Sequence, residues 1–94
     1  MDTPIGGKCD ARFGAVRQEF ALNFADRGEV GASVCVIVDG RVAVDLIGGW
    51  ADGARRQPWR FDTLVNIYSV GKPIVALLAL QLVDAGLIAL DDRL

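Results

Sequence analysis

The sequence contains no histidine, which removes the most common general base of hydrolytic enzymes. A Ser-His-Asp triad is therefore excluded, because its base is an imidazole. A zinc site is also disfavoured, since histidine is the usual zinc ligand and only two distant cysteines stand in for it. We expect no metal and no cofactor, so any hydrolytic chemistry in this chain must use another base.

Cysteines and long apolar runs are scarce as well. Cys9 and Cys35 do not form a C-x-x-C motif, and we expect two reduced thiols, with Cys35 buried in a strand. The longest apolar run, 74–80, is far below the roughly 18 residues of a membrane span. The first residues, "MDTPIGGKCDARFG", have neither the basic start nor the apolar run of a secretory signal. These features predict a soluble, cytoplasmic protein.

Positive charge is also limited. The net charge is -2 with a pI near 4.8, and the one basic cluster is Arg55, Arg56 and Arg60. Nucleic acids and anionic membranes recruit basic surfaces, so we expect neither as a partner and interpret the cluster as a solvated loop.

The composition is that of a small globular domain, and its first half predicts a helix and a hairpin. An aromatic and aliphatic stripe at helical spacing follows Asp10, a candidate N-cap, and Gly28 suits the C-terminal cap; its members are Phe13, Val16, Phe20 and Phe24. Asp39-Gly40 between two β-branched runs predicts a two-residue hairpin turn that pairs Val38 with Arg41 and Val36 with Ala43. Because both faces of this hairpin are largely apolar, we expect a larger antiparallel sheet between helical layers.

The second half predicts a loop and a buried helix. In "GGWADGARRQPW" and just after it, Trp50, Trp59 and Phe61 are expected to anchor the loop. A helix then runs from Ser69 to Gly86 and is apolar nearly all round, which is typical of a helix buried on all sides. One hairpin and one helix cannot cover it. We therefore expect residues 1–94 to be the N-terminal segment of a larger, incomplete domain.

Ser69 and Lys72 stand at the start of this helix, in "YSVGK". Three residues apart on a helix, their side chains share one face and can meet. The neutral amine of Lys72 would accept the proton of Ser69 as the serine attacks a carbonyl, and an apolar environment and the positive end of a helix both favour that neutral form. The free first-turn N–H of Ser69 would stabilise the oxyanion. The structural alternative is that Ser69 only caps the helix and Lys72 is an exposed first-turn residue.

Several motifs together resemble the serine β-lactamase and penicillin-binding-protein superfamily, and most closely its class C-like branch with the family VIII carboxylesterases. They are "GGWAD", "PWRFDTL", "YSVGK" and the apolar helix that ends in "GLIALDDRL", all in order between about Phe13 and Leu94. The resemblance implies an α/β (α+β) fold, of which this chain is the N-terminal part: helix, antiparallel hairpin, loop, and buried helix with the S-x-x-K motif.

The resemblance also implies a serine hydrolase that acts on a small ester or lactam through an acyl-enzyme on Ser69, with Lys72 as general base. Such enzymes carry a second motif, Tyr-x-Asn, and a third motif near the C-terminus that supplies the second oxyanion donor. Both motifs are missing, and Tyr68, beside the nucleophile, cannot replace the missing tyrosine. We therefore expect this chain alone to be inactive. Two alternatives stay open: a sensor that is acylated without turnover, and a subunit completed by its C-terminal part or by a second chain.

Overall fold

The computed structural model describes residues 2–93, which form two compact units that meet in sequence between Thr63 and Leu64. The first unit contains β1 (Ile5–Cys9), η1 (Ala11–Phe13), α1 (Gly14–Asp26), β2 (Gly31–Val38) and β3 (Arg41–Gly49). The second contains η2 (Tyr68–Val70) and α2 (Gly71–Asp84). The predicted order of helix, hairpin, loop and helix is confirmed, and β1 is an additional strand.

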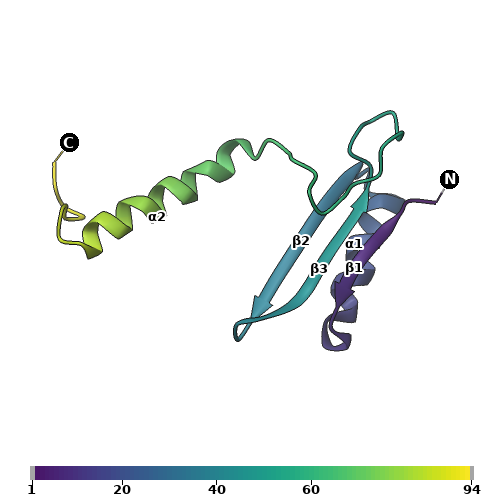
Figure 1. The fold of residues 1–94 in the computed structure, drawn as a ribbon, viewed down its shortest axis with the longest axis horizontal. Helices are drawn as coiled ribbons and strands as arrows, with labels where there is room; N and C mark the ends of the chain where they lie inside the picture. The colour runs from purple at the N-terminus through teal and green to yellow at the C-terminus, as the bar shows by residue number, and fades with distance from the viewer. Residues whose placement is uncertain (1, 94) are drawn as a thin grey trace. The chain divides into compact units, whose positions relative to one another are not determined.

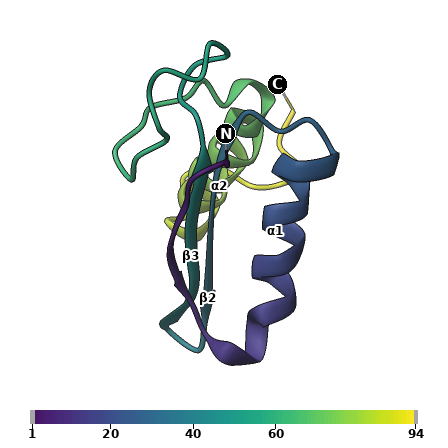
Figure 2. The ribbon, with the colours of Figure 1, turned by 90° about the vertical axis from the view of Figure 1, so that its right-hand side faces the viewer.

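The first unit is a three-stranded antiparallel sheet with one helix on one face. The strand order is β1-β3-β2 (Figure 1), and α1 runs along one side of the sheet (Figure 2). The core comprises Phe20 of α1 and Ala43, Val44 and Leu46 of β3. The ring of Phe24 packs edge-on against that of Phe20, with 5.1 Å between the ring centroids. The predicted aromatic stripe therefore faces the sheet.

The hairpin has the predicted turn but a different register. Val38 pairs with Arg41 as expected, whereas Val36 pairs with Val44 instead of Ala43, because a β-bulge follows Val36. In an unbroken hairpin the alternation that buries Ala43 would also turn Asp45 toward α1. The extra residue reverses the alternation, so that Val44 and Leu46 are fully buried and Asp45 is not.

Strand β1 was not predicted, because "IGGKC" has two glycines and no alternation of apolar and polar residues. Gly7 explains why glycine is needed here. Its φ is +105°, and a Cβ at this position would lie 2.0 Å from the Asp45 carbonyl oxygen. A side chain at residue 7 would therefore prevent β1 from pairing with β3.

Two further expectations for the first unit are wrong in part. Cys35 lies in β2 as predicted but is exposed, because it pairs with Asp45 on the face of the sheet away from α1. Phe61 is 66% exposed and does not anchor the loop. Trp59 does, because its ring lies where a Cβ on Gly31 would be, and its backbone N–H donates to the Gly49 carbonyl at 2.9 Å.

The predicted cap Asp10 belongs to the 3₁₀ turn η1 that precedes α1, whereas Gly28 ends α1 as predicted. The Asp10 carboxylate accepts the backbone N–H of Arg12 at 3.0 Å and also its guanidinium. The backbone hydrogen bond and then the side-chain bonds from Arg12 lower the pKa of Asp10 below its ordinary value. The helix α1 starts after η1, and its own N-cap, Phe13, makes no side-chain capping bond. At the other end, Gly28 has a φ of +75°, just past the last turn.

In the second unit, α2 begins at Gly71 rather than at Ser69, which lies in the preceding η2. Its C-terminus is a Schellman motif: the Leu87 N–H donates to the Leu82 carbonyl, the Gly86 N–H donates to the Val83 carbonyl, and Gly86 has a φ of +73°. At 14 residues α2 is too short to cross a membrane, and no other helix within residues 2–93 is a candidate span.

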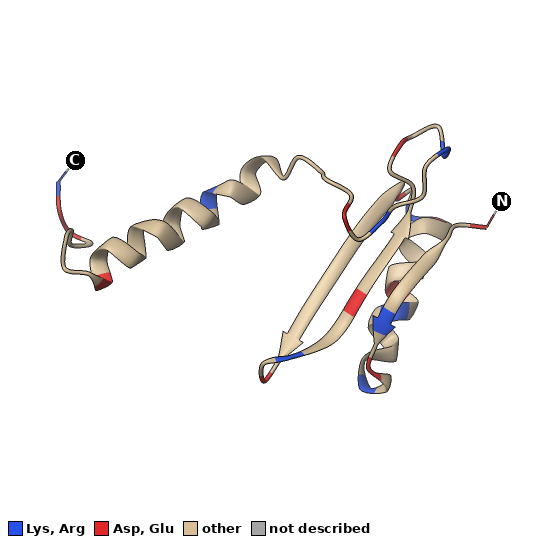
Figure 3. Cartoon of the chain, in the orientation of Figure 1, with Lys and Arg blue, Asp and Glu red and all other residues tan. Residues whose placement is uncertain are grey.

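The surface of α2 is apolar on every side. Its only charges are Lys72 near the start and Asp84 at the end (Figure 3). None of its side chains is buried by the part of the chain that the structure describes, and Leu77, Leu78 and Leu80 are each more than half exposed. The burial predicted for this helix therefore stays a prediction that requires further elements.

Candidate active site

The structure places the two predicted site residues together. Ser69 is the middle residue of η2, and Lys72 is the second residue of α2, one turn later. The Lys72 Nζ donates to the Ser69 Oγ at 3.5 Å, a long hydrogen bond. Ser69 has no side-chain capping bond to α2, so the structural alternative of a serine N-cap is not what the geometry shows. The Ser69 hydroxyl instead faces the amine of Lys72.

The backbone around Ser69 is tightly constrained. Tyr68 has a φ of +44°, in the left-handed region that a non-glycine residue rarely adopts. Its N–H donates to the Asn66 Oδ1 at 2.9 Å, and the Val70 N–H donates to the Ile67 carbonyl at 3.0 Å. Between them, the N–H of Ser69 has no acceptor within residues 2–93. This amide is therefore available to a ligand, as the sequence analysis expected of a first-turn N–H.

A hollow of about 580 Å³ lies over this turn, lined by Tyr68, Ser69, Gly71, Lys72 and Val75. The lining is mainly apolar apart from the Ser69 hydroxyl, the Lys72 amine and the Tyr68 phenol, which suits a small organic substrate with one polar reacting group. Both Ser69 and Lys72 are exposed. The apolar cover that would favour the neutral amine of Lys72 is therefore not supplied by residues 64–93.

Sequence reasoning missed Asn66 and the conformation of Tyr68. An asparagine often starts a turn, because its side-chain oxygen can accept the backbone N–H of the residue two positions later. Here the asparagine lies within "LVNIY", whose β-branched residues predict an extended segment. The side-chain hydrogen bond outweighs the extended tendency at this position and starts the turn that contains Ser69.

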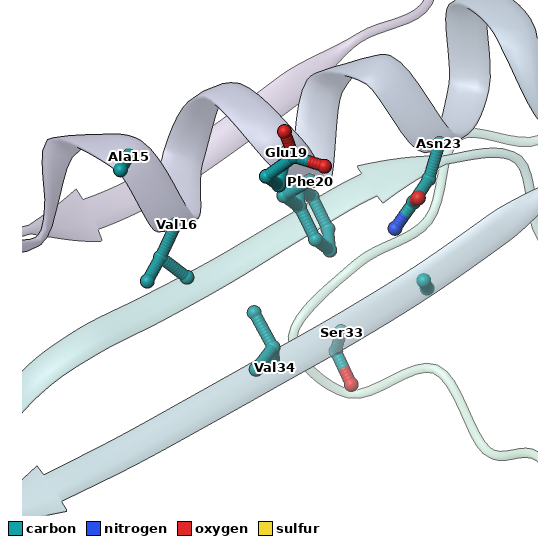
Figure 4. Close-up of a pocket in the computed structure, with 8 residues that line it drawn as sticks. Ala15, Val16, Glu19, Phe20, Asn23, Ser33 and Val34 are labelled. Atoms are coloured by element: carbon teal, nitrogen blue, oxygen red, sulfur yellow. The ribbon is translucent and has the colours of Figure 1, made fainter.

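A second hollow, about 500 Å³, lies between α1 and β2 in the first unit (Figure 4). Its polar side chains on α1 are already engaged: Arg27 forms an ion pair with Glu19 at 2.8 Å and donates to the Asn23 Oδ1 at 2.9 Å. Ser33 lines it too, without an amine or imidazole as base. No three His, Cys, Asp or Glu side chains gather as metal ligands anywhere in residues 2–93. The Ser69–Lys72 hollow is therefore the candidate active site.

Comparisons with known proteins identify the family of the chain. The family model described as Beta-lactamase matches residues 15–94. The chain is 38% identical over 84 residues to "Esterase/beta-lactamase LipL" of Mycobacterium tuberculosis, covering 89% of this chain and 20% of that protein. It is 39% identical over 90 residues to "Esterase EstB" of Burkholderia gladioli, covering 94% of this chain and 23% of that protein.

Two solved structures are similar. A family VIII carboxylesterase matches with a TM-score of 0.90 and 47% identity, over 96% of this chain and 24% of that one. A penicillin-binding protein homologue from Caulobacter crescentus matches with a TM-score of 0.88 and 48% identity, over 94% of this chain and 24% of that one. The chain thus spans about a fifth to a quarter of the length of these relatives. Because the family model covers most of its residues, the chain belongs to the beta-lactamase family.

Proposed function

We propose that this chain carries the nucleophile and the base of a serine hydrolase that acts through an acyl-enzyme on Ser69. The observation that carries the proposal is the 3.5 Å hydrogen bond from the Lys72 Nζ to the Ser69 Oγ in a chain of this family. A serine needs a base within hydrogen-bond reach, and with no histidine in the chain, Lys72 is the group in that place.

The reaction has two halves. The Ser69 Oγ attacks the carbonyl carbon while neutral Lys72 takes the hydroxyl proton, and the Ser69 N–H donates to the oxyanion that forms. The tetrahedral intermediate collapses to an ester on Ser69 as the leaving group departs with a proton. Water then attacks this ester, which releases the acid and restores the serine.

A carboxylic ester is the substrate class we favour. The curated relatives bear the names esterase and esterase/beta-lactamase, and one similar structure is a carboxylesterase. The mainly apolar hollow over Ser69 fits a short acyl chain. A lactam is the alternative substrate, because ring opening uses the same nucleophile and base.

We further propose that residues 1–94 alone do not turn over substrate. Lys72 is exposed within its unit, so its amine has no apolar cover there. Tyr68 is the chain's single tyrosine and precedes the nucleophile, so a second proton-transfer group has to come from elsewhere. The Ser69 N–H is one oxyanion donor, and a second donor would also come from outside this chain.

The direct test is a chimera in which this chain replaces the segment of the family VIII carboxylesterase that it matches, 24% of that chain. We expect the chimera to hydrolyse p-nitrophenyl butyrate, and Ser69→Ala to abolish the activity while the circular dichroism spectrum stays the same. A folded chimera without Ser69-dependent hydrolysis would contradict the proposal. A stable acyl adduct on Ser69 without turnover would identify a sensor instead.

A second experiment uses the isolated 94-residue chain and tests its proposed inactivity. Its intact mass, taken before and after treatment with a fluorophosphonate, is expected to stay unchanged, because the base is not activated. A single adduct on Ser69 that vanishes in Ser69→Ala would show that Lys72 activates the serine without further elements, and would overturn the proposed inactivity. Labelling that appears only when a second chain with the missing segments is added would identify a complementing subunit.

A further inference from the structure

The residue before the nucleophile has an unfavourable backbone conformation. Tyr68, with a φ of +44°, is one of three non-glycine residues with positive φ in the described chain. The others, Asp39 and Arg55, lie in the hairpin turn and in the loop before Pro58. A tyrosine has no short polar side chain with which to stabilise this conformation locally, unlike asparagine or aspartate. Something outside the Tyr68 side chain therefore has to stabilise it.

The contacts of the turn identify Asn66. The Asn66 Oδ1 accepts the Tyr68 N–H at 2.9 Å, and no other side chain within residues 2–93 bonds the backbone between residues 67 and 71. The remaining backbone bonds of the turn run from the Val70 N–H to the Ile67 carbonyl and from the Gly71 N–H to the carbonyls of Ser69 and Tyr68. The Val70–Ile67 bond closes a turn around Tyr68 and Ser69, but such a bond forms in turn types with either sign of φ at the second residue, so it does not by itself select the positive φ of Tyr68.

We propose that Asn66 is a positioning residue for the nucleophile: its side chain fixes the left-handed conformation of Tyr68 and thereby presents Ser69 to the substrate. The inference rests on the proposed function of Ser69 and adds a residue to that site. Because Asn66 occupies the Tyr68 N–H and Ile67 occupies that of Val70, the N–H of Ser69 is the one left for the oxyanion. The same conformation places Tyr68, a residue that is 81% exposed, in the lining of the hollow.

The proposal requires an oxygen acceptor at residue 66 and a residue at 68 that resists positive φ. Asn66→Ala removes the acceptor, and Asn66→Asp keeps it with the same geometry. Tyr68→Gly removes the resistance, because glycine adopts positive φ without a Cβ penalty. Asn66→Ala is therefore expected to disturb the turn when residue 68 is tyrosine, and to have little effect when residue 68 is glycine.

The test is NMR of the 94-residue chain. A strong NOE between the amide proton and the Hα of Tyr68 reports positive φ. We expect it in the wild-type chain and in Asn66→Asp, and we expect it to be lost in Asn66→Ala. In the Tyr68→Gly background, Asn66→Ala should leave the Ser69 amide resonance in place. A strong NOE that survives in Asn66→Ala, or that is missing from the wild-type chain, would overturn the proposal.

Turnover of the chimera gives the functional readout. Asn66→Ala is expected to lower kcat about tenfold, the effect of one lost hydrogen bond, and Asn66→Asp to restore most of it. Equal losses in the Ala and Asp variants would contradict a role for the oxygen acceptor. If the unmodified chimera is inactive, the proposed function of Ser69 fails, whereas the NOE still decides whether Asn66 fixes the turn.

Discussion

One long hydrogen bond, 3.5 Å from the Lys72 Nζ to the Ser69 Oγ, joins the amine and the hydroxyl that line the same hollow. The bond crosses from a 3₁₀ turn to the first turn of α2, so the backbone between them is short and regular. The separation is at the long end for a hydrogen bond.

The first prediction concerns the base. In the chimera, Lys72→Met should lower kcat by about 10²- to 10⁴-fold, the usual contribution of a positioned general base. Lys72→Arg should lower kcat to the same degree, because a guanidinium stays cationic and cannot accept the proton. Lys8→Met is the matched control, because Lys8 is the chain's other lysine and is exposed on β1. Full activity in Lys72→Met would exclude a lysine base.

The sequence was informative wherever a local signal decides the structure. The spacing of Phe20 and Phe24 predicted the buried face of α1, Asp39-Gly40 predicted the hairpin turn, and Gly86 predicted the end of α2. The S-x-x-K spacing placed the candidate nucleophile and base together. Each of these features depends on residues within about one or two turns of each other.

The features that sequence reasoning missed depend on contacts between distant segments or on competition within a turn. Strand β1 exists because Gly7 lets the backbone approach Asp45, a contact across about forty residues of sequence. The bulge at Ala43 follows from the cost of turning Asp45 toward α1, which is known only once α1 is placed on the sheet. The conformation of Tyr68 depends on one side-chain bond from Asn66.

The second prediction tests the bulge. Val44 is fully buried whereas Val42, two residues earlier, is 58% exposed, although an unbroken strand would place both on one face. Val44→Ala should lower the free energy of unfolding by about 2 kcal/mol, from two lost methyl groups and the cavity left behind. Val42→Ala should change it by less than about 0.5 kcal/mol. Urea unfolding followed by the fluorescence of Trp50 and Trp59 measures both, and equal losses would refute the shifted register.

The third prediction concerns the contact between α1 and β3. A Cβ on Gly48 would lie 2.7 Å from a ring carbon of Phe24 and 2.8 Å from one of Phe20. Gly48→Ala should therefore destabilise the first unit by about 1–3 kcal/mol, because the rings would have to move within a packed core. Gly53→Ala is the control, since nothing lies within 4 Å of a Cβ there. The same urea experiment applies, and an unchanged midpoint for Gly48→Ala would show that the rings have room.

The last prediction concerns pH and the loop that follows β3. The Asp52 Oδ1 accepts the backbone N–H of Arg56 at 2.9 Å and of Gln57 at 3.2 Å, and these bonds lower the pKa of Asp52. Since the ordinary value is about 3.9, the loop should be fully stabilised above about pH 4 and should lose that contribution as the pH falls through the lower, folded-state value. An NMR titration of the Asp52 carboxyl carbon, read together with the amide shifts of Arg56 and Gln57, measures this midpoint.

Asp52→Asn keeps the acceptor oxygen without the titration, so the two amide shifts should become nearly independent of pH in the acidic range. A midpoint for Asp52 at or above 3.9 would mean that the carboxylate does not stabilise the loop.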